Sequence, residues 1–205
     1  MTPFYVASLD IDTDSITDKL FMLKDMWELR STEYPFYTLG KTAYIDKHSK
    51  EYFDGVKKLN PILMANFAEL YETILNYFEK ALGESVKLST DLAYPGFHIF
   101  QSDKYFVEHA GNWHQDHPQI TLGLDSTDNS TFTVTIMLPM SGGGMDWVDA
   151  PKVMKHLAYK VKDITWHTGL SMHRIAGLKE YVEGEYRITL QGHLARRNGK
   201  MEIYW

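Results

Sequence analysis

The first part of the chain carries hydrophobic residues at helical spacing. Between residues 15 and 30 apolar side chains recur every three or four positions behind Ser15, a residue that can cap a helix. A longer stripe with the same period begins at Asn60, the expected N-cap, with Pro61 in the first turn, and Gly83 ends it after Leu82. The pattern therefore predicts two amphipathic helices.

Beyond Gly83 the pattern changes to short runs of β-branched and aromatic residues separated by turn signals. The expected strands are 96–101, 119–125, 131–138, 162–166, 172–176, 186–195 and 201–205. Asn198 and Gly199 separate the last two runs, and this dipeptide favours a hairpin turn.

Helices followed by strands indicate an α+β fold, a two-sheet jelly roll backed by the N-terminal helices. We expect about seven to nine strands. We also expect a single domain over residues 1–205, with mainly helical support over 1–90 and the jelly-roll core over 91–205.

Composition narrows the chemistry. The 205 residues include no cysteine, which excludes disulfide frameworks, thiolate nucleophiles and iron–sulfur clusters. The formal net charge of −6 argues against a protein that holds nucleic acid stably. The first residues lack the basic start of a secretory signal, and no apolar run is long enough to span a membrane. We therefore expect a cytoplasmic monomer or homodimer without a membrane partner.

Nine histidines remain for metal chemistry, and one of them stands in an H-x-D pattern. In an extended segment His114 and Asp116 point to the same side, so both can bind one ion. A third ligand must come from elsewhere: His173, in a strand-like run, is the best candidate, with His167 and His193 as alternatives. Two imidazoles and one carboxylate are typical of non-haem Fe(II) sites with open coordination positions.

Arg187 lies fourteen residues beyond His173 (187 − 173), in a strongly strand-like run. If its side chain is buried near the metal, it needs an anion, and its planar fork suits a carboxylate. Thr189 lies on the same face of that strand and would add a hydroxyl group. Two alternatives stay open: pairing of Arg187 with Glu183 or Glu185, and Arg174 as the anchor instead.

In this order the motifs resemble the Fe(II)/2-oxoglutarate-dependent dioxygenases, which have a cupin-like, double-stranded β-helix fold. The matching pattern is His114-x-Asp116, then His173, then Arg187. The glycine-rich segment 138–147 and the segment 169–175 are also similar to family turns and strands. No subfamily is identified.

The resemblance implies that His114, Asp116 and His173 hold Fe(II) and that Arg187 and Thr189 bind the far carboxylate of 2-oxoglutarate. It also implies an O2-dependent reaction that decarboxylates 2-oxoglutarate to succinate and hydroxylates a substrate, with desaturation or ring closure as variants.

We expect a small-molecule substrate, such as a free amino acid or a metabolite derived from one. Alternatives are a protein side chain or a nucleobase as substrate, or a non-catalytic jelly-roll binding module. Candidate substrate-contacting residues lie beside the ligands or on the preceding strand: His98, Gln101, Trp113, His117 and Trp147.

Overall fold

The computed structural model describes residues 4–46, 49–108, 111–124, 129–149, 153–168 and 171–205. Its helices are α1 (Thr13–Met22), a 3-10 helix (Lys24–Met26), α2 (Ala43–Asp46), α3 (Lys50–Leu82), α4 (Lys104–Glu108) and α5 (Pro118–Thr121). In these ranges no helix is both long and apolar enough to cross a membrane.

Nine strands form the major sheet: β1 (Tyr5–Ser8), β2 (Glu28–Leu29), β3 (Phe36–Leu39), β4 (Val86–Leu88), β5 (Gly96–Gln101), β6 (Asn129–Met137), β9 (Asp163–Thr168), β11 (Tyr186–Arg197) and β12 (Lys200–Tyr204). Their order is β1-β9-β6-β11-β5-β3-β2, and β12 lies between β11 and β4. The pairs are antiparallel except β12 with β4.

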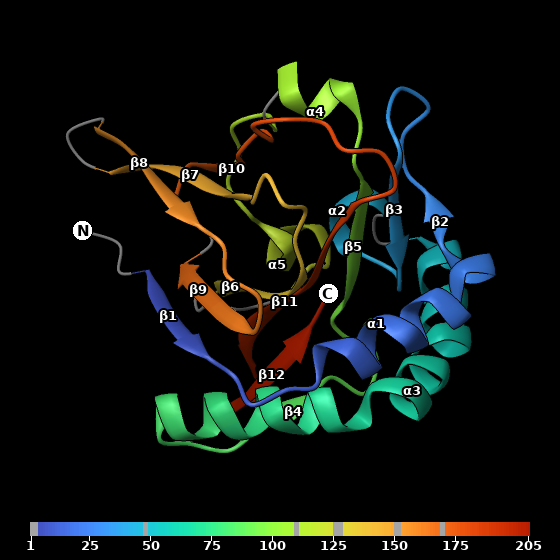
Figure 1. The fold of residues 1–205 in the computed structure, drawn as a ribbon. Helices are drawn as coiled ribbons and strands as arrows, with labels where there is room; N and C mark the ends of the chain where they lie inside the picture. The colour runs from blue at the N-terminus through green and yellow to red at the C-terminus, as the bar shows by residue number, and fades with distance from the viewer. Residues whose placement is uncertain (1–3, 47–48, 109–110, 125–128, 150–152, 169–170) are drawn as a thin grey trace.

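A minor sheet contains β7 (Gly144–Asp149), β8 (Val153–Ala158) and β10 (His173–Ile175) in the order β10-β7-β8. Figure 1 shows it across the centre of the molecule from β3 and β5, while α1 and α3 lie along the outside of the major sheet. The described residues thus confirm the predicted α+β jelly roll with helical support, although they form more strands than expected.

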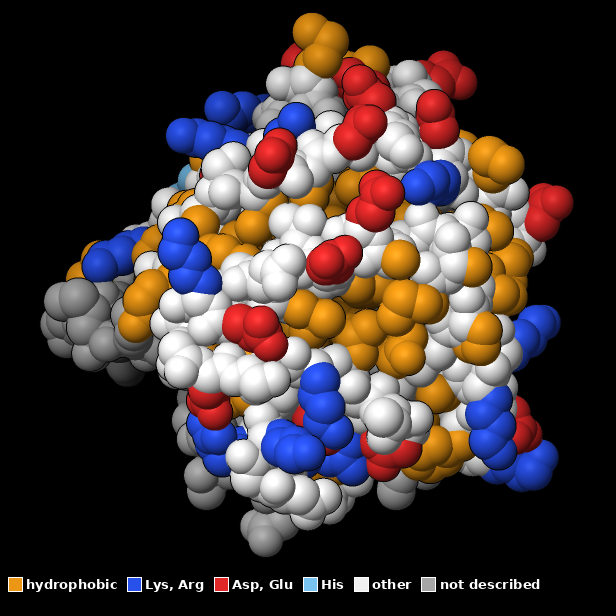
Figure 2. All heavy atoms as spheres, turned by 90° about the horizontal axis from the view of Figure 1, so that it is seen from below, with side chains coloured by type: hydrophobic (Ala, Val, Ile, Leu, Met, Phe, Trp, Pro, Cys, Tyr) orange, Lys and Arg blue, Asp and Glu red, His pale blue; other side chains and the backbone are white. Residues whose placement is uncertain are grey.

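The two faces of the major sheet differ because side chains alternate along each strand. On β6, Phe132, Val134 and Ile136 are fully or almost fully buried in the core beneath α3. The intervening threonines of β6 point to the opposite, inner face. The solvent side of the helical layer, seen from below in Figure 2, mixes acidic, basic and hydrophobic side chains. The helices therefore bury one face of the sheet and leave the other for a site.

The long helix begins ten residues before the predicted start. Ser49 caps α3 by accepting a hydrogen bond from a backbone N–H, and Asn60 lies inside the helix. The Asn60 side chain instead donates to the carbonyl of Leu92 and accepts from the N–H of Tyr94, at 2.9 and 3.0 Å. The cap assignment at Asn60 was wrong because this amide binds a loop rather than its own helix.

Two further predictions were wrong. The helix expected over residues 15–30 ends at Met22 and gives way to the 3-10 helix and β2. The strand expected over 119–125 contains part of α5, in which Pro118 occupies the first helical turn, a position where its missing N–H costs nothing. The hairpin prediction is confirmed, since Asn198 and Gly199 have φ values of 50° and 74° between β11 and β12.

Candidate metal centre and cavity

The two predicted histidine ligands lie side by side through a local backbone pairing. His114 and His173 form an isolated antiparallel bridge in which each N–H donates to the other's carbonyl, at 3.0 and 2.9 Å. This bridge joins the loop before α5 to β10 of the minor sheet, so residues far apart in the sequence present their rings 4.4 Å apart.

Asp116 completes a cluster with these histidines. Its two carboxylate oxygens lie 3.7 Å from Nε2 of His114 and 3.3 Å from Nε2 of His173. One ligand atom from each residue lies within 4.8 Å of the others. Thr131 of β6 donates its hydroxyl to Asp116 at 2.8 Å, and Asn129 donates to the backbone carbonyl of Asp116 at 3.0 Å. The major sheet therefore holds the carboxylate in place.

Both ligand histidines use the same nitrogen for support. Nδ1 of His114 lies 2.8 Å from the carbonyl of Asn112, and Nδ1 of His173 lies 2.7 Å from the carbonyl of Ser171. A carbonyl only accepts, so Nδ1 carries the proton and donates it. Nε2 is then left as a ligand atom in each ring.

Asp116 and His173 lie close enough to shift each other's pKa. Burial would raise the pKa of Asp116, but the close contact with His173 at 3.3 Å, together with His193 and Thr131, holds it well below its usual range. Burial would lower the pKa of His173, but its contact with Asp116 outweighs this and raises it. The carboxylate is thus charged at neutral pH.

The two rival histidines also face this region without joining the cluster. His193 places Nδ1 3.1 Å from the hydroxyl of Thr131, and His167 bonds the carbonyl of Thr168 while its ring contacts that of His173. Burial lowers the pKa of each to about 4, so both are neutral imidazoles. They form a neutral wall beside the cluster.

A cavity of about 650 Å³ opens onto the three clustered residues. Of the predicted substrate residues, His98 and His117 line it. Trp113 instead packs against the Arg174 guanidinium at 4.6 Å, and Trp147 against Phe4 at 4.4 Å. Neither tryptophan lines the cavity, so the structure does not bring them to the site.

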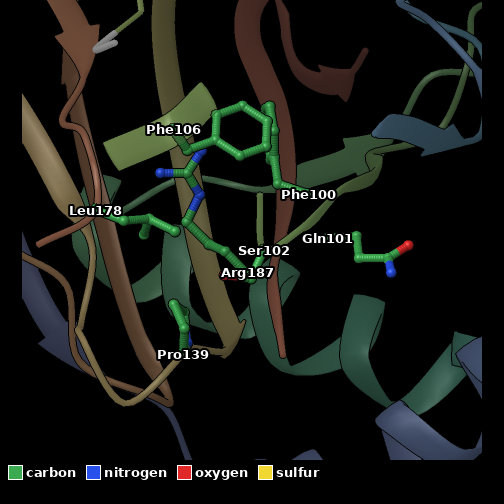
Figure 3. Close-up of a pocket in the computed structure, with 7 residues that line it drawn as sticks. All are labelled: Phe100, Gln101, Ser102, Phe106, Pro139, Leu178 and Arg187. Carbon is green, nitrogen blue, oxygen red and sulfur yellow. The ribbon is translucent and has the colours of Figure 1, made fainter. Parts of the chain in front are cut away.

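Arg187 projects into the cavity from β11. A smaller pocket surrounds it and shares Phe100 and Phe106 with the cavity, while Gln101 stands apart from the guanidinium (Figure 3). Arg187 is 5% exposed, lies over the Phe100 ring at 4.4 Å and donates to the carbonyl of Ala176 at 3.3 Å.

No carboxylate forms an ion pair with Arg187 in the part of the chain that the structure describes. Burial accordingly lowers the pKa of Arg187 to about 10, still far above neutrality. Glu185 accepts from the N–H of Met140 rather than from Arg187. Arg174 also lines the cavity, but its guanidinium is paired with Asp146 at 3.1 Å. The buried positive charge of Arg187 therefore faces the cavity unneutralised.

Thr189 occupies the inner face of β11, two residues from Arg187. It is 3% exposed and pairs in register with His98 of β5 and Thr135 of β6. It is not among the residues lining the cavity.

The sequence reasoning missed several residues that line the cavity. Thr131 and Thr133 come from β6, and Tyr159, which is hydrogen-bonded to Thr133, follows β8. Gln191 comes from β11. The alternation of threonine with apolar residues along β6 was the available signal, since it marks one polar face of a strand.

Comparison with solved structures identifies several proteins with a similar fold. The chain is similar to an N-substituted L-amino acid dioxygenase from Burkholderia ambifaria AMMD, with a TM-score of 0.63 and 12% identity over 98% of this chain and 86% of that one. It is similar to the non-heme alpha ketoglutarate dependent epimerase SnoN from nogalamycin biosynthesis, with a TM-score of 0.56 and 10% identity over 97% and 82% of the chains. An oxidoreductase of the 2OG-Fe(II) oxygenase family from Burkholderia pseudomallei aligns with a TM-score of 0.53 and 12% identity over 97% and 86%.

No family model and no curated protein matches the sequence. The resemblance to the Fe(II)/2-oxoglutarate-dependent dioxygenases is therefore confirmed at the level of the fold, which this chain shares with structures of that class over nearly its whole length.

Proposed function

We propose that this protein is an Fe(II)- and 2-oxoglutarate-dependent oxygenase that hydroxylates a small molecule. The observation that carries the proposal is the buried, unneutralised Arg187 in the same cavity as the His114, Asp116 and His173 cluster. The Arg187 guanidinium is suited to binding a carboxylate, and the three-residue cluster is suited to binding a metal. A dicarboxylate with a metal-chelating end would satisfy both.

The donor set fits ferrous iron. Two imidazole Nε2 atoms and one carboxylate converge from one side, and both imidazoles are oriented by carbonyls at Nδ1. Three protein ligands would leave coordination positions for a co-substrate and O2, as in non-haem Fe(II) sites. His114, Asp116 and His173 would thus hold the metal.

Arg187 would bind the far carboxylate of 2-oxoglutarate. Its guanidinium is buried, so an ionic contact there is weakly screened by water, and its two terminal nitrogens can bind a carboxylate bidentately. We assign Tyr159 and Thr133, which line the cavity, to the same end of the co-substrate, while the role expected for Thr189 stays a prediction because that residue does not line the cavity. Neutral His167 and His193 add no positive charge that would draw the carboxylate away from Arg187.

When bound, iron would support a reaction in which 2-oxoglutarate, O2 and a substrate C–H group give succinate, CO2 and the hydroxylated product. The cavity of about 650 Å³ exceeds what a five-carbon co-substrate fills, so a second small molecule fits beside it. Amino acids or their derivatives are the substrate class we propose, supported by the dioxygenase acting on N-substituted L-amino acids among the similar structures.

The test is an anaerobic titration with Fe(II) and keto acids, monitored by the visible absorption band of the iron–keto acid chelate. We compare 2-oxoglutarate with 2-oxovalerate, which lacks the far carboxylate. The wild type should prefer 2-oxoglutarate by about 100-fold or more, because breaking a buried charge pair costs about 3–5 kcal/mol. In Arg187→Met this preference should nearly disappear, and His173→Ala should abolish the band.

Arg196→Met is the matched control, since Arg196 lies on the same strand but is ion-paired with Glu84 away from the cavity. It should keep the wild-type preference. If the wild type shows no saturable band, the oxygenase proposal is wrong and the binding-module alternative gains support. Equal affinity of the wild type for both keto acids would remove the role assigned to Arg187.

A further inference from the structure

One wall of the cavity is built almost entirely of aromatic rings. They come from β3 and the residues around it, from α2, β5 and α4: Tyr34, Phe36, Tyr44, Phe100, Tyr105 and Phe106. Two pairs are stacked, Tyr34 on Tyr105 at 4.5 Å and Phe36 on Phe100 at 4.4 Å. The rest of the lining includes the metal cluster and the neutral histidines His167 and His193. We call the six residues the aromatic wall.

Most of the aromatic wall belongs to a small hydrophobic cluster that is separate from the main core: Phe36, Phe100 and Phe106 are buried there, and Tyr34 and Tyr105 pack against them. Core rings such as Phe97 and Phe132 are 0% exposed, whereas Phe36 and Phe100 retain 8% and Phe106 retains 9%. Tyr34 and Tyr105 are only half-buried. Because all of the wall residues line the cavity, the surface they leave open is available to a ligand.

A hydrogen-bonding pair stands at the edge of the aromatic wall. His98 is 4% exposed, its Nε2 lies 2.7 Å from the Tyr44 hydroxyl, and its Nδ1 has no hydrogen-bond partner in the described residues. Burial and the charge of Arg187 lower the pKa of His98 to about 3, so the ring is neutral. If Tyr44 donates to Nε2, the Nδ1–H stays unpaired, but that nitrogen has no exposed surface through which to reach a ligand. If Nε2–H donates instead, the tyrosine O–H is a spare donor.

We propose that the aromatic wall is a substrate subsite for a flat, aromatic ring, and that the His98–Tyr44 pair donates a hydrogen bond to an oxygen on the side chain that the ring carries. This inference rests on the proposed function for the reaction that follows binding. It narrows the substrate class to ring-bearing compounds, such as amino acid derivatives with an aromatic substituent. Stacked and edge-to-face contacts with the wall would supply the selectivity, because saturated rings lack the quadrupole that favours them.

Two probes of equal heavy-atom count test the ring preference: 3-phenylpropionamide and 3-cyclohexylpropionamide. Their binding is measured by ligand-observed NMR and calorimetry on the anaerobic protein with Fe(II) and 2-oxoglutarate, and again on the metal-free protein. The phenyl probe should bind about three- to tenfold more tightly. Phe36→Leu should reduce this ratio to near one. Tyr34→Leu, at a half-buried position that tolerates substitution better, should lower it in the same direction.

The hydrogen-bonding pair is tested separately. Tyr44→Phe should weaken both probes by about fivefold and leave their ratio unchanged, because it removes a contact to the shared amide oxygen. The control is Tyr37→Phe, since Tyr37 lies on the other face of β3 against Trp27 and does not line the cavity. It should change neither affinity.

Equal or tighter binding of the cyclohexyl probe, or no binding of either probe at millimolar concentration, would overturn the subsite. Unchanged affinities in Tyr44→Phe would overturn the role of the pair. Failure of the proposed function is seen elsewhere, in the iron–keto acid band, which is recorded without these probes. A protein that forms the band but shows no ring preference is an oxygenase without this subsite.

Discussion

The same strands form both faces of the major sheet, but one face packs in the hydrophobic core and the other lines the cavity. On β6, Phe132 packs against Phe78 of α3, with ring centroids 5.2 Å apart, in a core that excludes water. One residue along, Thr133 faces the cavity and is hydrogen-bonded to Tyr159. On β11, Leu190 belongs to the core, while Arg187 faces the cavity. Alternation along a strand therefore separates the residues that hold the fold from those proposed to act.

Substitution at Phe132 is expected to give the largest effect on stability. Phe132→Ala should lower the free energy of unfolding by about 3–5 kcal/mol, because it removes a fully buried ring beneath α3. Urea denaturation measures this loss. The folded protein should still bind Fe(II) and 2-oxoglutarate as the wild type does.

Thr133→Val is the matched change on the other face. It should change the free energy of unfolding by about 1 kcal/mol or less. It should also weaken the binding of 2-oxoglutarate, since Tyr159 loses its hydrogen bond to Thr133. If Phe132→Ala impaired co-substrate binding as much as Thr133→Val, the two faces would not be separable. Phe132→Leu provides a milder version if the alanine variant does not fold.

The same alternation explains what could be predicted from the sequence. His114, Asp116 and His173 were identified by motif and order, and the structure brings them together because a backbone bridge joins two distant segments. Arg187 was identified by its spacing and its strand. Their residue types, order and spacing were therefore enough to predict them as candidates from a single sequence, and the roles assigned to them stay predictions.

Other parts of the site depend on tertiary contacts that no local pattern contains. Tyr44 and Tyr159 reach the cavity from short elements, α2 and the turn after β8, that show no periodicity. Conversely, Trp113 and Trp147 neighbour the ligands in sequence or strand pairing but pack on other groups. Neither kind of proximity placed a tryptophan on the cavity. Trp113 directly precedes His114 but stacks on Arg174, and Trp147 pairs in register with His173 but packs against Phe4.

A smaller effect is expected on the inner face at Thr131. Thr131→Val keeps the shape of the side chain but removes the hydroxyl that donates to Asp116 at 2.8 Å and contacts His193. A support of this kind for a metal ligand is worth about 10–100-fold in metal affinity. Competition with a chelator should therefore show weaker Fe(II) binding, with the fold retained.

Thr135→Val is its control, because Thr135 is on the same strand and the same face but does not line the cavity. Its Fe(II) affinity should equal that of the wild type. A similar loss of Fe(II) affinity in both variants would mean that a change in the sheet weakens metal binding, and not the loss of the hydrogen bond to Asp116.

The last prediction concerns ion pairs next to the inner face. Their contribution to the free energy of unfolding is expected to depend on pH. The Asp46 carboxylate accepts hydrogen bonds from both terminal nitrogens of Arg30, at 2.8 and 3.0 Å, and from the backbone N–H of Thr42. Burial would raise the pKa of Asp46, but these contacts outweigh it and lower the pKa. The unfolded chain therefore binds a proton more readily, so this stabilisation is present above the ordinary aspartate pKa near 4 and is lost as pH falls through the lower folded value.

Asp46→Asn should cost about 1–2 kcal/mol at pH 7, and its difference from the wild type should shrink as urea unfolding is repeated from pH 5 to pH 3. The outer helical surface offers the comparison, since Asp54 pairs with Lys50 in solvent at 2.8 Å. Asp54→Asn should have a much smaller effect, because water screens that pair. A cost at Asp46 that stays constant over this pH range would show that packing, and not the charge, is what the carboxylate contributes beside the inner face.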